Sequence, residues 1–433
     1  MNLLQLEGYD LHSATETEHD FHLRVTPVKK PVYCQKCFRR DLVGFGKREQ
    51  VVKDLPRLGK RTAVYVTASR WRCKKCGSTC FDELPHVNER RQMTQRLVSW
   101  IGQQAVSRTF AAIAEEVGVT EGTIRRMFSD YVQDAYDDLR IDTPRWLGID
   151  EIYLIKPRCV LTNVEERTAV DILPTRNKDA VVKRLCDWID RRKVELVTID
   201  MWRPYRDACR IAIPNATVIV DKFHVLRMAN EAVERVRKSL RSGLTKHQRR
   251  GLVNDRWLML KRRHDLTERD QMMLSGWLLN YPDLAAAYEV KEAAYEIYDA
   301  ASSEEAKDRY AQWRADVPQT MRGAFGDFQR AWDNWETEIS AYFDNRITNA
   351  YTESLNNLIR TTNRIGRGYS FDALRAKILL SEGGQKVRRP KFQRMTGTMG
   401  REVPDGIFPA NLGIDLSTLW RAFNVDGEEP IST

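Results

Sequence analysis

The chain has 433 residues, of which 42% are hydrophobic and 30% are charged. That length is enough for two to four domains of roughly 150 residues each and for at least one sizeable core. No uninterrupted apolar run approaches the roughly 18 residues that a membrane span requires. The first residues have neither the basic start nor the apolar stretch of a signal peptide. These features exclude a small disulfide scaffold and a membrane protein, and we expect a cytoplasmic location.

The net charge is +10, and residues 1–92 contribute 18 Lys and Arg against 11 Asp and Glu. Such a basic block suits a polyanionic partner, with DNA or RNA the first choice. A basic domain without a nucleic-acid partner would carry the same charge, so the motifs must decide between the two interpretations.

Residues 1–92 also contain two Cys-x-x-Cys pairs, Cys34 with Cys37 and Cys73 with Cys76. Each pair lets two thiolates reach one cation from a tight turn, and four thiolates complete a closed tetrahedral shell with no open position for chemistry. The spacing predicts a structural Zn²⁺ in a zinc-ribbon-like DNA-binding module, with the alternating segment before Cys73 as a strand. A redox role would need a βαβ context, which is absent. Cys80 is an alternative ligand or a spare thiol.

A helical pattern follows in residues 93–140. Apolar residues recur at helical spacing from Phe110 to Val117, Gly118 interrupts the pattern, and a second run starts after Thr120, which stands where an N-cap is needed. This arrangement is typical of a helix-turn-helix, although an ordinary helical hairpin has the same pattern. The second helix of a helix-turn-helix offers side chains to the major groove of DNA, here Glu121, Thr123, Arg125 and Arg126.

From residue 141 the pattern changes to strands. It predicts three strands in succession, then a helix, a strand, a helix and a strand, at residues 146–155, 158–165, 168–174, 177–193, 194–200, 205–213 and 216–221. The order βββαβαβ predicts an α/β fold with a ribonuclease H-like catalytic core, which is a mixed sheet with helices on both faces.

The remaining residues divide into three parts. Residues 222–340 carry several Trp residues and no strand pattern, which predicts an all-helical insertion. This insertion separates the first part of the core, residues 141–221, from the second part, residues 341–385. Residues 386–433 begin with a basic segment and continue without a helical or strand pattern, so we predict no structure for them.

Three carboxylates stand where phosphodiester chemistry needs them. Asp150 and Asp200 end the first and fourth strands of the core, which lie side by side in this topology, so both can reach one divalent cation. Glu353 lies on a helix that can pack across the sheet edge, with a polar face of Asn349, Glu353, Asn356 and Arg360 and an apolar face of Leu355, Leu358, Ile359 and Thr362. Each acid alone would fit a turn, a cap or a solvated position. Their joint placement predicts a catalytic site.

The chemistry of such a site is known in outline. Two hard cations about 3.5 to 4 Å apart can activate water or a 3′-hydroxyl and stabilise the leaving oxygen during in-line displacement at phosphorus. Oxygen ligands favour Mg²⁺, or Mn²⁺ in its place. Asp221 and His224, at the end of the fifth strand, are possible auxiliary residues, although a helix-capping Asp and a packed His fit equally well. Glu151 should point to the opposite face of the sheet, and we do not expect it to be a ligand.

These motifs resemble those of the DDE transposases (named for Asp, Asp and Glu) of the bacterial insertion-sequence family ISL3. The resemblance runs from Cys34 to about Leu380 and is carried by the two Cys-x-x-Cys pairs with DLP between them, the helix-turn-helix, GIDE, TIDMWRPY, VIVDKFHV, TNAYTESLNNLIR and RIGRGYSFDALRAKIL. It implies catalytic and magnesium-binding roles for Asp150, Asp200 and Glu353. It also implies that the amino-terminal modules bind the element's terminal inverted repeats. Phe38 departs from the family pattern, because a Gly is usual after the first Cys-x-x-Cys pair.

We therefore expect a transposase that binds its element ends, cleaves DNA by metal-assisted hydrolysis and joins 3′-hydroxyl ends to target DNA by transesterification. Lys74 and Lys75 are expected to contact phosphates. A dimer should form on DNA, in the nucleoid. One alternative is a DNA-binding regulator whose sheet has no catalytic activity, but the presence of all three acids argues against it. The other is a nuclease or junction resolvase, which would not explain two DNA-reading modules.

Overall fold

The computed structural model describes residues 6–138 and 141–384. The predicted tail at 386–433 lies outside the described residues. The amino-terminal module is a sheet of order β1-β2-β4-β3, with β5 paired to β4. Its strands are β1 (Tyr9–Glu16), β2 (Asp20–Pro27), β3 (Leu42–Arg57), β4 (Lys60–Cys73) and β5 (Thr79–Phe81). The strand predicted before Cys73 is confirmed as part of β4.

Both Cys-x-x-Cys pairs lie at one end of this sheet. Cys73 ends β4 and pairs with Leu42 at the start of β3, and the first pair lies in the connection that enters β3. Small apolar side chains fill the core of the sheet at its other end, including Leu23, Val25 and Val64. A core of this size does not stabilise the end of the sheet that carries the cysteines, so that end needs another source of stability.

Three helices follow, α1 (Gln95–Ser107), α2 (Phe110–Val117) and α3 (Glu121–Asp138). Gly118 ends α2 in the left-handed conformation, with φ 75°, which glycine adopts without a steric cost. Thr120 Oγ1 accepts the backbone N–H of Thr123 at 3.3 Å, so the predicted N-cap is confirmed. Two short helices that meet at this turn form the predicted helix-turn-helix arrangement, with α1 packed against α3.

The central sheet has the strand order β10-β9-β6-β7-β8. Its strands are β6 (Trp146–Tyr153), β7 (Pro157–Asn163), β8 (Thr168–Leu173), β9 (Leu196–Ile199) and β10 (Thr217–Val220). The strands β6, β9 and β10 run parallel, whereas β7 is antiparallel to both of its neighbours. The predicted order of strands and helices is confirmed, and the sheet is mixed as expected.

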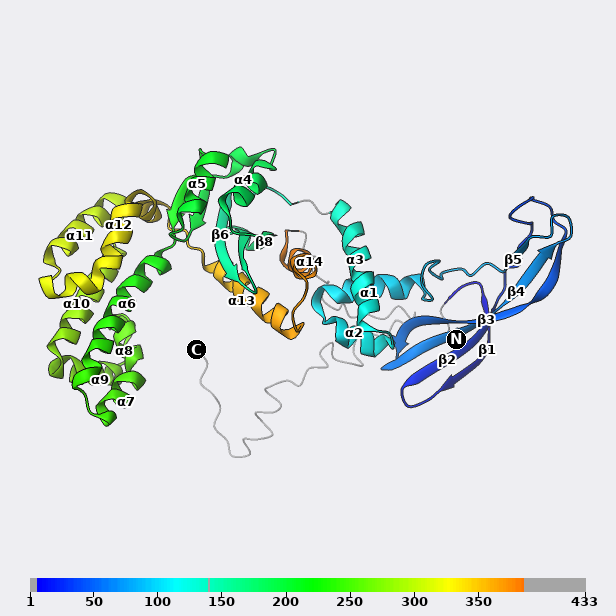
Figure 1. The fold of residues 1–433 in the computed structure, drawn as a ribbon, viewed down its shortest axis with the longest axis horizontal. Coiled ribbons are helices and arrows are strands. Elements are labelled where there is room, and N and C mark those ends of the chain that lie inside the picture. The colour runs from blue at the N-terminus through cyan, green and yellow to red at the C-terminus, as the bar shows by residue number, and fades with distance from the viewer. Residues whose placement is uncertain (1–5, 139–140, 385–433) are drawn as a thin grey trace, which may run out of the picture. The chain divides into compact units, whose positions relative to one another are not determined.

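Helices cover both faces of this sheet (Figure 1). One face packs against α4 (Lys178–Cys186) and α5 (Arg203–Ala212), and the other against α13 (Ala350–Ile365) and α14 (Phe371–Glu382). The helix predicted over 177–193 is too long. It ends at Cys186 because the chain then turns to bury Trp188 in the core, and residues Arg191–Lys193 form a separate 3₁₀ turn.

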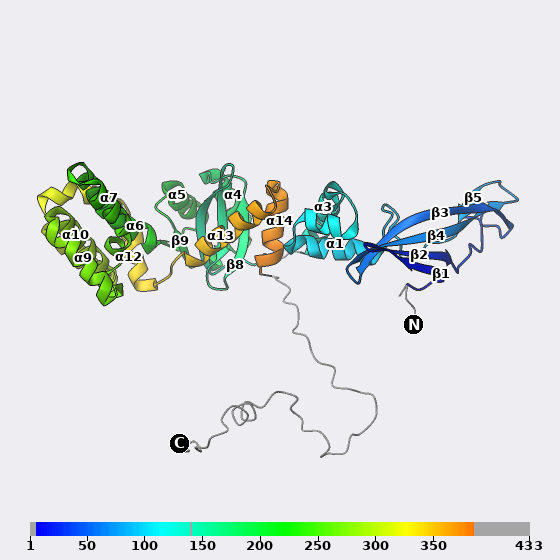
Figure 2. The same ribbon diagram turned by 90° about the horizontal axis from the view of Figure 1, so that it is seen from below.

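Residues 222–345 form helices and contain no strand, as predicted (Figure 2). The helices are α6 (Lys222–Ser239), α7 (Lys246–Asn254), α8 (Arg256–Leu260), α9 (Glu268–Asn280), α10 (Pro282–Ile297), α11 (Ser303–Asp316) and α12 (Gln319–Asn345), with 3₁₀ turns at Leu240–Gly243 and Arg263–Asp265. Trp313, Trp332 and Trp335 are buried in the core of this insertion, whereas Trp257 is 60% exposed. Within the described ranges, no helix combines the length and the apolarity needed to cross a bilayer.

Candidate active site and zinc centre

Three aspartates stand in one row at the carboxyl edge of the parallel strands. Ile149 of β6 pairs with Ile199 of β9, and Ile199 pairs with Val220 of β10. Each of these three residues is followed directly by an aspartate, namely Asp150, Asp200 and Asp221. Ligands of open α/β sheets bind at this edge. The predicted proximity of Asp150 and Asp200 follows from this register, and the register adds Asp221 to the same row.

The helix α13 docks on the sheet through buried amides and hydroxyls. Asn356 Nδ2 donates to Asp150 Oδ2 at 2.8 Å. Asn349 accepts from the Thr198 hydroxyl at 3.1 Å and donates to the carbonyl of Ile149 at 3.3 Å. These bonds turn Asn349 and Asn356 of the predicted polar face toward the sheet, whereas Arg360 of the same face is exposed.

A glycine makes this close approach possible. A Cβ built on Gly148 would lie under 3.0 Å from side-chain oxygens of Thr162, Thr352 and Asn349. The Thr162 and Thr352 hydroxyls share a hydrogen bond of 2.7 Å over this glycine. Of the predicted apolar face, Leu355 and Ile359 are buried against the sheet, Thr362 is half-buried, and Leu358 is 41% exposed.

His224 occupies the centre of the acidic group. Ligand atoms of Asp150, Asp200 and His224 lie within 4.8 Å of one another, and so do those of Asp221, His224 and Glu353. His224 therefore belongs to both groups. The sequence predicted the three acids as the core of the site and His224 as an optional addition, whereas the geometry joins the acids through His224.

The acids are held in an environment that disfavours their charge. Burial raises the pKa of Asp200 to about 7, with the charges of Asp150 and Glu151 adding to the effect. Burial, with a contribution from the charge of Glu353, also raises the pKa of Asp150 and of Asp221 to about 6 each. Buried like charges have this effect because each ionised carboxylate destabilises the next. Burial and the charge of Arg227 lower the pKa of His224 to about 4, which keeps its imidazole neutral at pH 7.

The residues present fit divalent cations. Among the described residues, Asp200 Oδ1, Asp221 Oδ2 and His224 Nε2 are buried without a hydrogen-bond partner. A buried polar atom without a partner is costly, and a bound cation would supply the missing partner and the missing positive charge. Carboxylate oxygens favour Mg²⁺ or Mn²⁺, and an imidazole is a ligand of the latter more often than of the former.

Arg176 is a neighbour of this site that the sequence did not indicate. Its guanidinium pairs with Glu151 and lies over the Trp202 ring, 4.4 Å from the ring centroid. Trp202 follows Asp200 by two residues, and its backbone N–H donates to the Asp200 carbonyl at 2.7 Å. Arg176 thus connects Glu151 to Trp202, in the loop that follows Asp200. An isolated Arg between a strand and a helix carries no sequence signal for this role.

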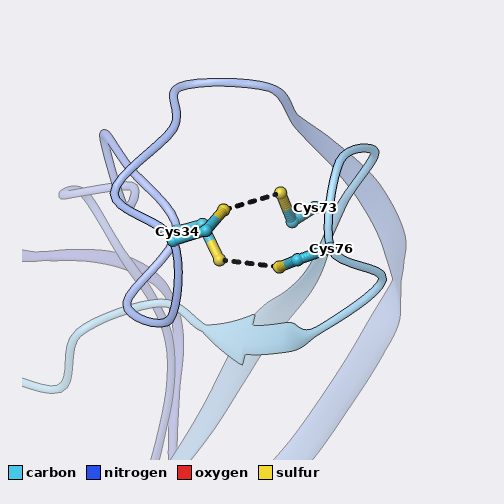
Figure 3. A group of neighbouring side chains, drawn as sticks. Cys34, Cys73 and Cys76 are labelled. Carbon is cyan, nitrogen blue, oxygen red and sulfur yellow. Dashed lines mark hydrogen bonds between the residues drawn. The ribbon is translucent and has the colours of Figure 1, made fainter.

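The four predicted zinc ligands converge. Cys34 Sγ lies 3.5 Å from Cys76 Sγ, and Cys37 Sγ lies 3.6 Å from Cys73 Sγ. Figure 3 shows the sulfurs of Cys34, Cys73 and Cys76 turned toward one another from two separate turns. Tetrahedral ligation with Zn–S bonds of about 2.3 Å requires sulfurs about 3.8 Å apart, so the set fits Zn²⁺. Cys80 is buried beside this set and outside the group of four.

The two cysteine turns have the same backbone. The N–H of Phe38 donates to the Cys34 carbonyl at 2.8 Å, and the N–H of Gly77 donates to the Cys73 carbonyl at 3.0 Å. Both residues are left-handed, with φ of 58° at Phe38 and 71° at Gly77. A glycine adopts this conformation freely, whereas a residue with a Cβ is strained. The departure noted at Phe38 therefore falls on a position whose backbone favours glycine.

The predicted recognition residues do not share one environment. Arg126 is exposed, and no partner for it is found among the described residues. Arg125 donates to Glu121 at 2.6 Å and lies over the Phe110 ring. The Thr123 hydroxyl lies 3.0 Å from that of Thr120. Lys74 and Lys75 are exposed in the second cysteine turn.

Three family models match the chain. A zinc-finger of transposase IS204/IS1001/IS1096/IS1165 matches residues 30–76. A helix-turn-helix domain of transposase family ISL3 matches residues 83–132, and a DDE transposase model of ISL3 matches residues 147–378, more than half of the chain.

Two kinds of curated protein are similar over most of their length. The transposase for insertion sequence element IS1001 of Bordetella parapertussis is 22% identical over 352 residues, which cover 79% of this chain and 86% of that protein. The transposase for insertion sequence element IS1557, from two strains of Mycobacterium tuberculosis, is 25% identical over 330 residues, which cover 68% of this chain and 72% of that protein.

The raised pKa of Asp200 predicts how its replacement changes stability. A carboxyl whose pKa is raised on folding costs stability as the pH rises from its unfolded value, near 4, through its folded value, near 7. Without magnesium, Asp200→Asn should therefore stabilise the core by roughly 1 to 3 kcal/mol at pH 8, and by less at pH 5. Thermal unfolding at the two pH values measures this, with the exposed Asp308→Asn as control. An equal gain at both would contradict it.

The strained turn at Phe38 predicts a stabilising change. Phe38→Gly should stabilise the zinc-loaded module by about 0.5 to 1 kcal/mol, because relief of the left-handed strain exceeds the added backbone entropy. Little packing is lost, since Phe38 is 74% exposed. Gly77→Ala is the reciprocal control and should destabilise by about 1 kcal/mol. Both are measured by thermal unfolding, and a destabilised Phe38→Gly variant would show that the side chain matters more than the backbone.

Proposed function

The chain belongs to the ISL3 family of insertion-sequence transposases, and on that premise we propose how it acts. It binds the terminal inverted repeats of its element, cleaves DNA by metal-assisted hydrolysis, and joins the freed 3′-hydroxyl ends to target DNA by transesterification. The observation that carries this proposal is the row of Asp150, Asp200 and Asp221 on adjacent strands, with Glu353 and His224 against it.

We further propose that the catalytic core is ribonuclease H-like. Support comes from the order of its five strands, in which three parallel strands follow an antiparallel hairpin across one mixed sheet. The division proposed for the chain is unchanged from the sequence, with a zinc-ribbon-like module at 1–92, a helix-turn-helix at 93–140, the core at 141–221 and 341–385, and the insertion at 222–340.

The roles of the residues follow from their placement. Asp150 and Asp200 hold the divalent cations at the strand ends, and Glu353 completes the shell from α13. Bound cations would supply the positive charge that activates the attacking oxygen and stabilises the leaving one. Asn356 and the backbone N–H of Glu151 hold Asp150 in its rotamer through bonds of 2.8 and 2.7 Å, and each carboxylate oxygen keeps a second lone pair for a ligand. His224, neutral at pH 7, adds a nitrogen ligand or a hydrogen bond to a phosphate, and Asp221 is an auxiliary acid.

The amino-terminal modules recognise DNA in this proposal. The four cysteines hold a structural Zn²⁺, which supplies folding energy to a module with a small core. Lys74 and Lys75 contact phosphates, and α3 enters a major groove with Thr123, Arg125 and Arg126. The protein acts as a homodimer, because two element ends have to be held together before joining, and it works in the nucleoid of the cytoplasm. The buried Trp residues of the insertion are core residues, and Trp257 and Phe223 are exposed aromatic anchors of the insertion.

Loss of any proposed acid should stop the chemistry and spare recognition. Asp150→Ala, Asp200→Ala and Glu353→Ala should each abolish cleavage and joining of a duplex that carries the gene's flanking repeat, while binding of that duplex is unchanged. A double variant should be little worse than a single one, since one lost ligand already dismantles the unit. Asp207→Ala, an exposed acid of α5, is the control. Cleavage in magnesium by Glu353→Ala would mean that the third acid is misassigned.

The two arginines of α3 should differ. Arg126→Ala should weaken binding of the flanking repeat by about 1 to 3 kcal/mol relative to a scrambled duplex, as expected for a base contact. Arg125→Ala should cost less, because its guanidinium is already engaged by Glu121. Mobility shifts with both duplexes measure this difference. Equal losses in the two variants would show that Arg125 leaves Glu121 to reach DNA.

A further inference from the structure

Two arginines and two phenylalanines gather on one exposed face of the amino-terminal sheet. Arg70 and Arg72 project from the same side of β4. The Arg70 guanidinium lies 5.4 Å from the centroid of the Phe45 ring and 5.8 Å from that of Phe81, and the Arg72 guanidinium lies 5.2 Å from the Phe45 ring. All four side chains are exposed. We call these four residues the arginine–phenylalanine face.

A β-bulge aims Phe45 onto this face. The pairing of β3 with β4 shifts between Gly44 and Lys47, so that Phe45 and Gly46 together oppose Arg70. Gly46 has a φ of 110°, which a residue with a Cβ adopts rarely. Bulges re-aim side chains and recur at functional positions. The bulge leaves Phe45 47% exposed, so it does not serve the core of the sheet.

The positive charge of this face is uncompensated. The Arg70 guanidinium donates to the Thr79 hydroxyl at 3.1 Å, and within the described part of the chain neither Arg70 nor Arg72 pairs with a carboxylate. Arg24 on the neighbouring strand β2 is different. It also lies over an aromatic ring, that of Tyr65 at 5.3 Å, but it is neutralised by Glu49 at 3.0 Å. Arg24 is thus a neutralised counterpart, on the same sheet, of the two arginines that lack a counter-charge.

We propose that the arginine–phenylalanine face binds the duplex of the element end. Exposed guanidiniums without a carboxylate are available to an anionic partner, and Arg binds phosphate with matched geometry. At this face β4 lies between β3 and β5, so its two arginines can follow a phosphate backbone, while an exposed phenyl ring beside them can make an apolar contact in a groove. This inference rests on the proposed function for its partner, and it adds a contact surface to Lys74 and Lys75.

The test compares the zinc-loaded full chain with three variants, Arg70→Ala/Arg72→Ala, Phe45→Ala and the matched control Arg24→Ala. Binding is measured by fluorescence anisotropy over a series of salt concentrations, with a duplex carrying the gene's flanking repeat and with a scrambled duplex of equal length. Zinc content and circular dichroism check that each variant is folded. Cleavage of the same duplex by the parent protein in magnesium reports on the proposed function separately.

The double arginine variant should lower the slope of log affinity against log salt by about 1.8 on both duplexes, since each lost phosphate contact removes about 0.9. Phe45→Ala should weaken binding about fivefold or more without a change in slope, and Arg24→Ala should match the parent. An unchanged slope in the double variant, while the parent still cleaves its repeat, would overturn this inference and leave the proposed function standing. A change in subunit assembly alone, seen by light scattering, would make the face a protein interface and overturn it equally.

Discussion

The docking of α13 on the central sheet is the contact on which the candidate active site depends. It joins residues 206 positions apart in the chain, Asp150 and Asn356. The interface is a set of buried amides and hydroxyls around Gly148, and such a network is stable only when its members are paired. Because the helix is held by directed bonds, its rotation is defined, and Glu353, one turn before Asn356, lies beside Asp221 and His224. Leu355 and Ile359 of the same helix add apolar contacts to the interface.

Burying neighbouring carboxylates destabilises the protein, and the rest of the fold has to offset that cost. Three aspartates with raised pKa values share the sheet edge, and two of their oxygens, Asp200 Oδ1 and Asp221 Oδ2, have no partner within the described protein. The apolar layer beneath the sheet, which includes Ile149 and Ile199, keeps the strands in register despite this cost. Bound cations would supply the missing partners of these oxygens, and clusters of perturbed groups are typical of functional sites.

Two buried charged contacts connect the modules of the described chain. Asp54, in the DLP motif, accepts from the Thr94 hydroxyl at 2.7 Å and from Arg96 at 2.8 Å, which ties the zinc-bearing sheet to the first turn of α1. Although burial opposes it, these bonds hold the pKa of Asp54 below its usual value. Lys377 of α14 donates to the carbonyl of Arg108 at 2.8 Å, beside the Phe110 ring. The DLP motif thus has a structural role that its sequence alone did not suggest.

The sequence by itself determined most of the elements and the residue types of the two candidate metal sites. The cysteine pairs, the glycine and threonine between α2 and α3, and the acids at strand ends are local signals, because each depends on residues close together in the chain. Tertiary structure decided which of these residues meet. Only the strand register adds Asp221 to the row, only the docking of α13 shows that Asn356 holds Asp150, and only the position of α6 places His224 between the acids. The role of Arg176 and the bulge at Phe45 could not be predicted from the sequence either, because their partners come from other strands and helices. Pairing across a sheet leaves no periodic pattern in either segment.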